Sequence, residues 1–150
     1  ASIRDILTFC DADFEDLGKV LYGGPMMGIA VYTDAEPVLK NTNAIIALNR
    51  ADSVAPKSYP CVHCGRCVAA CPMGLNPTAY AKAMNVSDGA DRSARLLDAK
   101  INLCIECGCC SFACPSRRPL VETNRLAKAD LRDYQAKQKE LEEKQKEAAK

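Results

Sequence analysis

The sequence predicts an α+β protein in three parts, and each part rests on one observation. Residues 1–50 combine a short helical pattern with apolar, β-prone stretches, which indicates a small mixed piece. Residues 51–120 contain all but one of the ten cysteines, in runs spaced for metal ligation. Residues 121–150 are dominated by Lys, Glu, Gln and Ala, which predicts one long, charged helix.

The N-terminal part carries the signals of one helix and three strands. Ser2 is a suitable N-cap for a helix over residues 3–9, because its hydroxyl can accept a bond from the first turn. Apolar, β-prone stretches follow at residues 19–22, 28–32 and 43–48. Gly23–Gly28 lacks the spacing of a dinucleotide fingerprint and the Gly-Lys-Ser/Thr ending of a P-loop. It therefore predicts a turn.

Helices are expected between and after the cysteine runs. Asn76 and Pro77 form an N-cap and N1 pair for a helix ending near Met84, and Asp88 or Asp91 caps a second helix. The last segment predicts a long helix with a thin apolar stripe. We expect that helix to end as a solvent-exposed tail, because its Lys, Glu and Gln leave too few large apolar residues for a coiled coil.

Composition narrows the class of protein. The hydrophobic fraction is 48%, yet there is no Trp and only 5% aromatic residues, so the core is light and benefits from cross-links. The formal net charge of +1 points to neither nucleic acid nor an anionic membrane surface. No apolar run reaches the roughly 18 residues of a membrane span. No basic-then-apolar leader opens the chain, which favours metal binding over disulfides.

Two cysteine runs carry the chemistry. Both have the pattern C-x2-C-x2-C-x3-C-P, with a Gly after the second cysteine, and they begin at Cys61 and Cys104. In proteins with two [4Fe–4S] clusters, the first three cysteines of such a run ligate one cluster and the fourth ligates the other. The sequence therefore predicts two clusters. The predicted ligands are Cys61, Cys64, Cys67 and Cys114 for cluster I, and Cys104, Cys107, Cys110 and Cys71 for cluster II.

Other assignments of these residues are less favoured. Zinc sites need only one or two C-x2-C pairs, and adjacent cysteines such as Cys109 and Cys110 are hard to pair as disulfides. Cys109 is expected to pack beside cluster II without ligating it, and Cys10 to be a small buried residue. His63 is expected to face solvent or to lie near a sulfur, since each cluster already has four thiolates.

Charged residues near the runs suggest unequal clusters. Arg66 lies inside the first run, and Arg117 and Arg118 follow the second, so we expect all three to surround cluster I. Glu106 lies in the run of cluster II. Cluster I is then expected to have the higher reduction potential. The alternative is that the arginines are solvated surface charges or contacts for an acidic partner. With a single histidine, no hydrolase-type catalytic site is predicted.

Five segments occur in an order typical of one family. They are Gly-Gly-Pro-Met-Met-Gly at 23–28, Pro-Val-Leu-Lys-Asn-Thr-Asn-Ala-Ile-Ile at 37–46, Pro-Cys-Val-His-Cys-Gly-Arg-Cys at 60–67, Cys-Ile-Glu-Cys-Gly-Cys-Cys at 104–110 and Pro-Leu-Val at 119–121. Over residues 15–130 the chain resembles the C subunit of the Rnf complex, the ion-translocating ferredoxin:NAD oxidoreductase. A related alternative is the cobalamin reductase of propanediol-utilising microcompartments.

The resemblance implies a role for each part. Residues 1–50 would be the end of an SLBB (β-grasp-like) domain, residues 51–120 an α-helical-ferredoxin-like module with two [4Fe–4S] clusters, and residues 121–150 a C-terminal helix. FMN and NAD(H) would bind a preceding domain outside this chain, which alone would be a non-catalytic electron carrier. It would lie peripherally on the cytoplasmic side of the membrane. Its partners would be other redox subunits and ferredoxin. A structural metal-binding interaction module is the alternative from another functional class.

Overall fold

The computed structural model describes residues 1–148, and its first unit, residues 1–57, begins with helix α1 (Ile3–Phe9). A capping box starts this helix. The Ser2 hydroxyl accepts a bond from the Asp5 backbone N at 3.2 Å, and Asp5 Oδ2 accepts one from the Ser2 backbone N at 2.7 Å. The predicted helix and its N-cap are confirmed.

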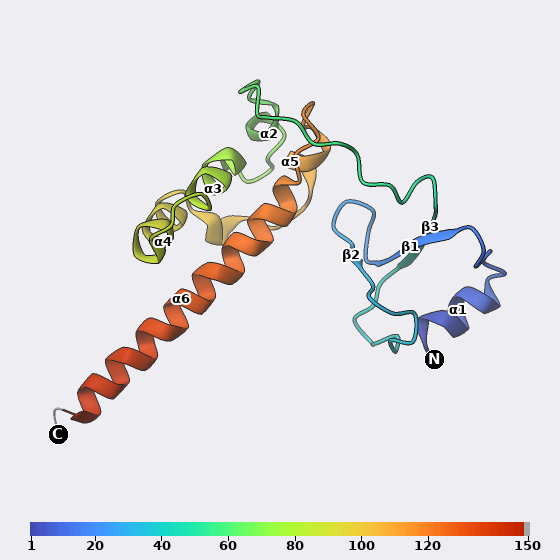
Figure 1. The fold of residues 1–150 in the computed structure, drawn as a ribbon, viewed down its shortest axis with the longest axis horizontal. Coiled ribbons are helices and arrows are strands. Elements are labelled where there is room, and N and C mark those ends of the chain that lie inside the picture. The colour runs from blue at the N-terminus through green and yellow to red at the C-terminus, as the bar shows by residue number, and fades with distance from the viewer. Residues whose placement is uncertain (149–150) are drawn as a thin grey trace. The chain divides into compact units, whose positions relative to one another are not determined.

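Three antiparallel strands complete the first unit. They are β1 (Leu17–Tyr22), β2 (Ile29–Ala30) and β3 (Ile45–Asn49), in the order β2-β1-β3 (Figure 1). Tyr22 pairs with Ile29 on one side and with Ile45 on the other, which fixes the register. Ile3 and Leu7 of α1 form a small core with Val20 of β1. The three predicted strands are present, but β2 is much shorter than the predicted stretch.

The second unit begins at Ser58 and is helical. In chain order it contains α2 (Arg66–Ala69), α3 (Pro77–Ala83), α4 (Gly89–Asp98), the 3-10 helix η1 (Ile101–Leu103), α5 (Cys109–Phe112) and α6 (Leu120–Ala148). The Asn76 side chain caps α3 with Pro77 at its first position, and Asp88 caps α4 through bonds from Ala90 N and Asp91 N. Of the two predicted caps for α4, Asp88 is therefore correct.

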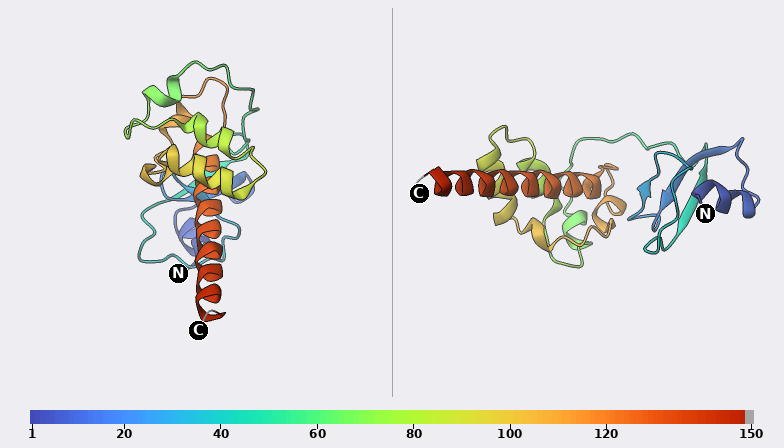
Figure 2. Two further views of the ribbon diagram at one scale, coloured as in Figure 1. Left: turned by 90° about the vertical axis from the view of Figure 1, so that its left-hand side faces the viewer. Right: turned by 90° about the horizontal axis from the view of Figure 1, so that it is seen from below.

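The second unit has an internal repeat that follows the cysteine runs. Each run passes through a four-residue helix, α2 or α5, and then leads into a longer helix, α3 or α6. Helix α6 is the longer copy, and Figure 2 shows it extending past the other helices of its unit. The repeat therefore places α3 and α6 in equivalent positions behind the two runs.

The main core of the second unit lies where α6 crosses α3 and α4. It consists of Leu75, Tyr80, Ala83, Leu96, Ile101, Ala127 and Leu131. A partly buried ion pair joins α4 to α6, with Arg92 Nε 2.7 Å from Asp130 Oδ2. The first part of α6 is thus packed into the core of the second unit. The prediction of a separate charged helix did not include this packing.

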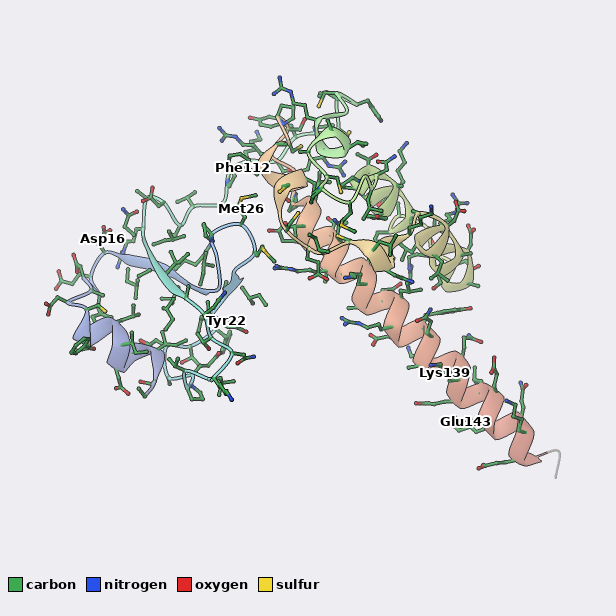
Figure 3. The ribbon with its side chains drawn as sticks, turned by 180° about the vertical axis from the view of Figure 1, so that it is seen from behind. Asp16, Tyr22, Met26, Phe112, Lys139 and Glu143 are labelled. Atoms are coloured by element: carbon green, nitrogen blue, oxygen red, sulfur yellow. The ribbon has the colours of Figure 1, made fainter. Side chains whose placement is uncertain are left out.

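The rest of α6 matches the predicted exposed tail. Residues 135–147 are all exposed, and Leu141, a member of the expected apolar stripe, is 51% exposed. The side chains of Lys139 and Glu143 project from the helix (Figure 3). The packed part of the helix therefore ends at Tyr134, which lies against Gly89 of α4.

Candidate metal centres

The two cysteine runs share an unusual backbone. His63 and Gly65 in the first run have φ values of 55° and 74°, and Glu106 and Gly108 at the equivalent positions have 56° and 81°. The left-handed region costs a residue other than glycine about 1–2 kcal/mol. Alternation between left- and right-handed residues turns successive N–H groups toward one concave, anion-binding face. The backbone of both runs therefore suits the binding of a negatively charged group.

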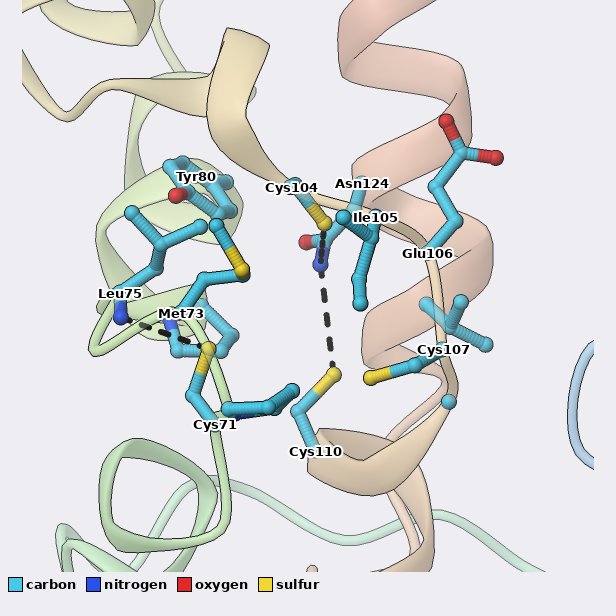
Figure 4. A pocket seen from close by; sticks show the side chains of 14 residues that line it. Cys71, Met73, Leu75, Tyr80, Cys104, Ile105, Glu106, Cys107, Cys110 and Asn124 are labelled. Carbon is cyan, nitrogen blue, oxygen red and sulfur yellow. Dashed lines mark hydrogen bonds between the residues drawn. The ribbon is translucent and has the colours of Figure 1, made fainter.

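Four cysteines of mixed origin line one cavity, here called cavity II. Cys104, Cys107 and Cys110 come from the second run and Cys71 from the end of the first. Figure 4 shows their sulfurs facing one common space. The remaining wall is mainly apolar, with Leu75, Tyr80 and Val121 among its residues.

The reciprocal set lines a second cavity, here called cavity I. Cys61, Cys64 and Cys67 come from the first run and Cys114 from the end of the second. Its wall is more polar, with Asn76, Thr78, Ser116 and Arg118. The structure thus brings together the same two groups of four that the spacing predicted. All ten cysteines lie within the described part of the chain, and there each is a free thiol without a disulfide partner.

Hydrogen-bond donors reach the sulfurs of cavity II. The Leu75 backbone N donates to Cys71 Sγ at 3.3 Å. Asn124 Nδ2 lies 3.6 Å from Cys104 Sγ and 4.0 Å from Cys110 Sγ (Figure 4). Asn124 is not among the site residues predicted from the sequence. The signal that could have found it is a lone amide among the apolar residues Leu120, Val121 and Ala127, at helical spacing.

Glu106 lies in the second run, as noted from the sequence, and is held in a compact ion cluster with two cations of α6. Its carboxylate accepts bonds from Lys128 Nζ at 2.8 Å and Arg125 Nε at 3.3 Å. Lys128 Nζ also donates to the Cys104 carbonyl at 2.9 Å, which fastens the second run to α6. The bond from Lys128 lowers the pKa of Glu106, against the opposing effect of its partial burial. Glu106 therefore does not make the surroundings of cavity II more negative.

The arginines are less closely gathered than predicted. Arg118 is half-buried and lines cavity I, whereas Arg66 and Arg117 are exposed and line neither cavity.

Cys10 and His63 are both exposed in the structure. Cys10 is exposed, so its prediction as a buried residue is wrong, because α1 ends at Phe9 and leaves it outside the core. His63 is exposed at the rim of cavity I, as expected.

Burial affects the thiols at the centre of the unit. Cys67 and Cys110 pack with Leu120 in one apolar cluster. Burial raises the pKa of the Cys110 thiol to about 11 and also raises the pKa of Cys67. Both thiols are therefore protonated at neutral pH without metal, and ligation must displace their protons. Four cysteines around each cavity match the donor set of a [4Fe–4S] cluster, which supplies one-electron redox chemistry when bound.

The chain is similar in sequence to a family model and to several known proteins. Residues 59–118 match the family model of the 4Fe-4S dicluster domain. The C subunit of the ion-translocating oxidoreductase complex from Rhodobacter capsulatus is 43% identical over 75 residues, which is 50% of this chain and 14% of that protein. The equivalent protein from Pseudomonas aeruginosa is 35% identical over 136 residues, which is 90% of this chain and 17% of that protein. The chain belongs to this family of C subunits.

This C-subunit homologue therefore binds iron–sulfur clusters through a 4Fe-4S dicluster domain. A further relative is the C subunit of the Na(+)-translocating ferredoxin:NAD(+) oxidoreductase complex of Acetobacterium woodii. It is 35% identical over 90 residues, which is 60% of this chain and 19% of that protein. The homologue thus spans less than a fifth of the length of these relatives. Among the residues described, none forms a helix both long and apolar enough to cross a membrane.

Proposed function

We propose that the chain holds two [4Fe–4S] clusters and passes electrons within an ion-translocating oxidoreductase complex. The observation that carries the proposal is the composition of the two cavities, each lined by three cysteines of one run and the fourth of the other. We assign Cys61, Cys64, Cys67 and Cys114 to cluster I in cavity I. We assign Cys104, Cys107, Cys110 and Cys71 to cluster II in cavity II.

The chain's own residues suit this role in three ways. The left-handed positions of the two runs curve the backbone around each cavity, and the cysteines supply thiolates once their protons leave. The apolar wall of cavity II limits the access of water. Cys67 of one set and Cys110 of the other pack in the same apolar cluster, so the two ligand sets meet in the interior of the unit. This arrangement favours electron transfer between the clusters.

The names of the relatives suggest the setting. The relative from Clostridium ljungdahlii belongs to a proton-translocating ferredoxin:NAD(+) oxidoreductase complex, and that from Acetobacterium woodii to a Na(+)-translocating one. For this chain we infer a peripheral place on the cytoplasmic side of a membrane complex, with other redox subunits and ferredoxin as partners. FMN and NAD(H) would bind elsewhere in the full-length protein.

The finer division of the chain follows from the same inference. The sheet and helix of the first unit support the assignment of residues 1–50 as the end of an SLBB (β-grasp-like) domain. Residues 51–120 would be the α-helical-ferredoxin-like cluster module. Residues 121–150 would be its C-terminal helix, whose first turns also complete cavity II through Val121 and Asn124.

Iron analysis and two cysteine variants test the proposal. The anaerobically prepared chain should contain about eight irons with matching sulfide, and dithionite should bleach its colour reversibly. Cys71→Ser should perturb cluster II while leaving the spectrum of cluster I intact, and Cys114→Ser should do the reverse. Damage by Cys71→Ser to the cluster of Cys61, Cys64 and Cys67 alone would exclude the cross-ligation. Colour that dithionite cannot bleach would favour a structural metal module instead.

A further inference from the structure

Asn124 is a polar residue in an apolar part of the second unit. It lies on α6 between Val121 and Ala127 and is only 1% exposed. Buried amides are costly unless their polar atoms are paired, and an apolar residue of similar size would fill the same space. Packing alone therefore gives no reason for an asparagine at this position.

The two polar atoms of the Asn124 side chain have different surroundings. Nδ2 points toward the sulfurs of Cys104 and Cys110, at 3.6 and 4.0 Å (Figure 4). Oδ1 is buried without a hydrogen-bond partner among the described residues. An amide that leaves its acceptor unpaired while its donor faces two cavity sulfurs is poorly placed for stability. Its placement instead suits an anionic group held by those sulfurs.

The equivalent position behind cavity I carries no donor. When the two cysteine runs are superimposed, Ala81 of α3 occupies the position of Asn124 on α6. An alanine side chain has no N–H group to offer. The internal repeat therefore contains a donor at this position in one copy and lacks it in the other.

We propose that Asn124 is a positioning residue that raises the reduction potential of cluster II selectively, an inference that rests on the proposed two-cluster function. Reduction adds one electron to a cluster and increases the negative charge on its sulfurs. An N–H donor stabilises the more negative state more strongly, because hydrogen bonds to charged acceptors are the stronger ones. Hydrogen bonds to sulfur are among the factors that set cluster potentials. No proton transfer is required.

The test is a potentiometric titration of the intact, cluster-loaded chain, with each reduced cluster followed by its EPR signal. Cys64→Ser and Cys107→Ser assign the two signals. Asn124→Leu and Asn124→Ala both remove the donor, but one fills the space and the other empties it. At the wild-type midpoint potential, each variant should have a ratio of reduced to oxidised cluster II about tenfold lower. This corresponds to a midpoint potential lowered by about 59 mV for a one-electron couple. Cluster I should not shift.

Leu131→Ala is the matched control, because Leu131 is a buried core residue of the same helix that does not line either cavity. It should lower thermal stability and leave both potentials unchanged. The inference is overturned if the Asn124 variants leave the midpoint potential of cluster II unchanged or shift the potentials of both clusters equally. It is also overturned if they shift the potential of cluster II no more than Leu131→Ala does. If the wild-type chain lacks two EPR-active clusters, the proposed function fails before this inference is reached.

Discussion

Cavities I and II are built from the same cysteine pattern, but they differ in the exposure and polarity of the residues around it. In cavity II, Gly108 is buried, the wall is largely apolar, and two N–H donors reach the sulfurs. In cavity I, Gly65 and Cys64 are exposed and the wall contains more polar residues. The difference arises from the elements behind the runs, since the packed half of α6 covers cavity II. The repeat thus specifies the ligands, and the surrounding helices specify their environment.

Removal of iron should affect the two cavities unequally, and this is the largest effect we expect. Cys71 and Cys104 of cavity II pack against the main core, whereas Cys67 and Cys114 of cavity I pack in a small apolar cluster around Leu120. After chelation, hydrogen exchange should accelerate most in residues 59–70, by about tenfold or more, and less in residues 104–114. Helices α3, α4 and α6 should keep most of their protection. Equal acceleration of hydrogen exchange across the whole second unit would show that its core is not stable without metal.

Glu106→Gln should lower the stability of the loaded chain through a contact beside cavity II. It removes the ion pairs with Lys128 and Arg125, and half-buried pairs of this kind contribute about 1 kcal/mol. Chemical unfolding of the loaded chain should show this loss, while Glu122→Gln, at an exposed position of α6, should change little.

The pH dependence of the Glu106 effect has a definite sign. Because its pKa in the folded chain is lowered from 4.5, its contribution is complete above the unfolded value and is lost as pH falls through the folded one. The difference between wild type and Glu106→Gln should therefore be constant from about pH 8 to pH 6. A difference that grows or disappears within that window would contradict the ion-pair explanation.

The smallest effect is expected from the arginines at cavity I. Arg118 lines the cavity, so Arg118→Gln should lower the midpoint potential of cluster I. At the wild-type midpoint, its ratio of reduced to oxidised cluster should fall about two- to fivefold. Arg66→Gln should have less effect, because Arg66 is exposed and its charge is screened. Weaker binding of a partner with an unchanged cluster I potential would identify these arginines as docking contacts. The expectation that all three arginines raise this potential is thus narrowed to one residue.

Local signals in the sequence predicted the features that depend on neighbouring residues. The Ser2 and Asn76 caps are examples, because a cap acts within one turn of its helix. The grouping of the cysteines followed from the chemistry of their spacing. Asn124 and Lys128 could not be found in this way, because their roles depend on how α6 docks against a run some 20 residues earlier in the chain. Exposure of Cys10 was missed for the same reason, since burial depends on tertiary packing.

Each cavity contains cysteines of both runs, so neither ligand set is complete until both runs have been synthesised. Cys61, Cys64 and Cys67 are synthesised before Cys114, which their cavity also needs. The other cavity cannot close before Cys110. At about 5–20 residues per second, the first run spends roughly 2–8 seconds as open thiols before the second run is synthesised. Both ligand sets then become complete almost together, so four-thiolate ligation in either cavity can be completed only after the second run has been synthesised.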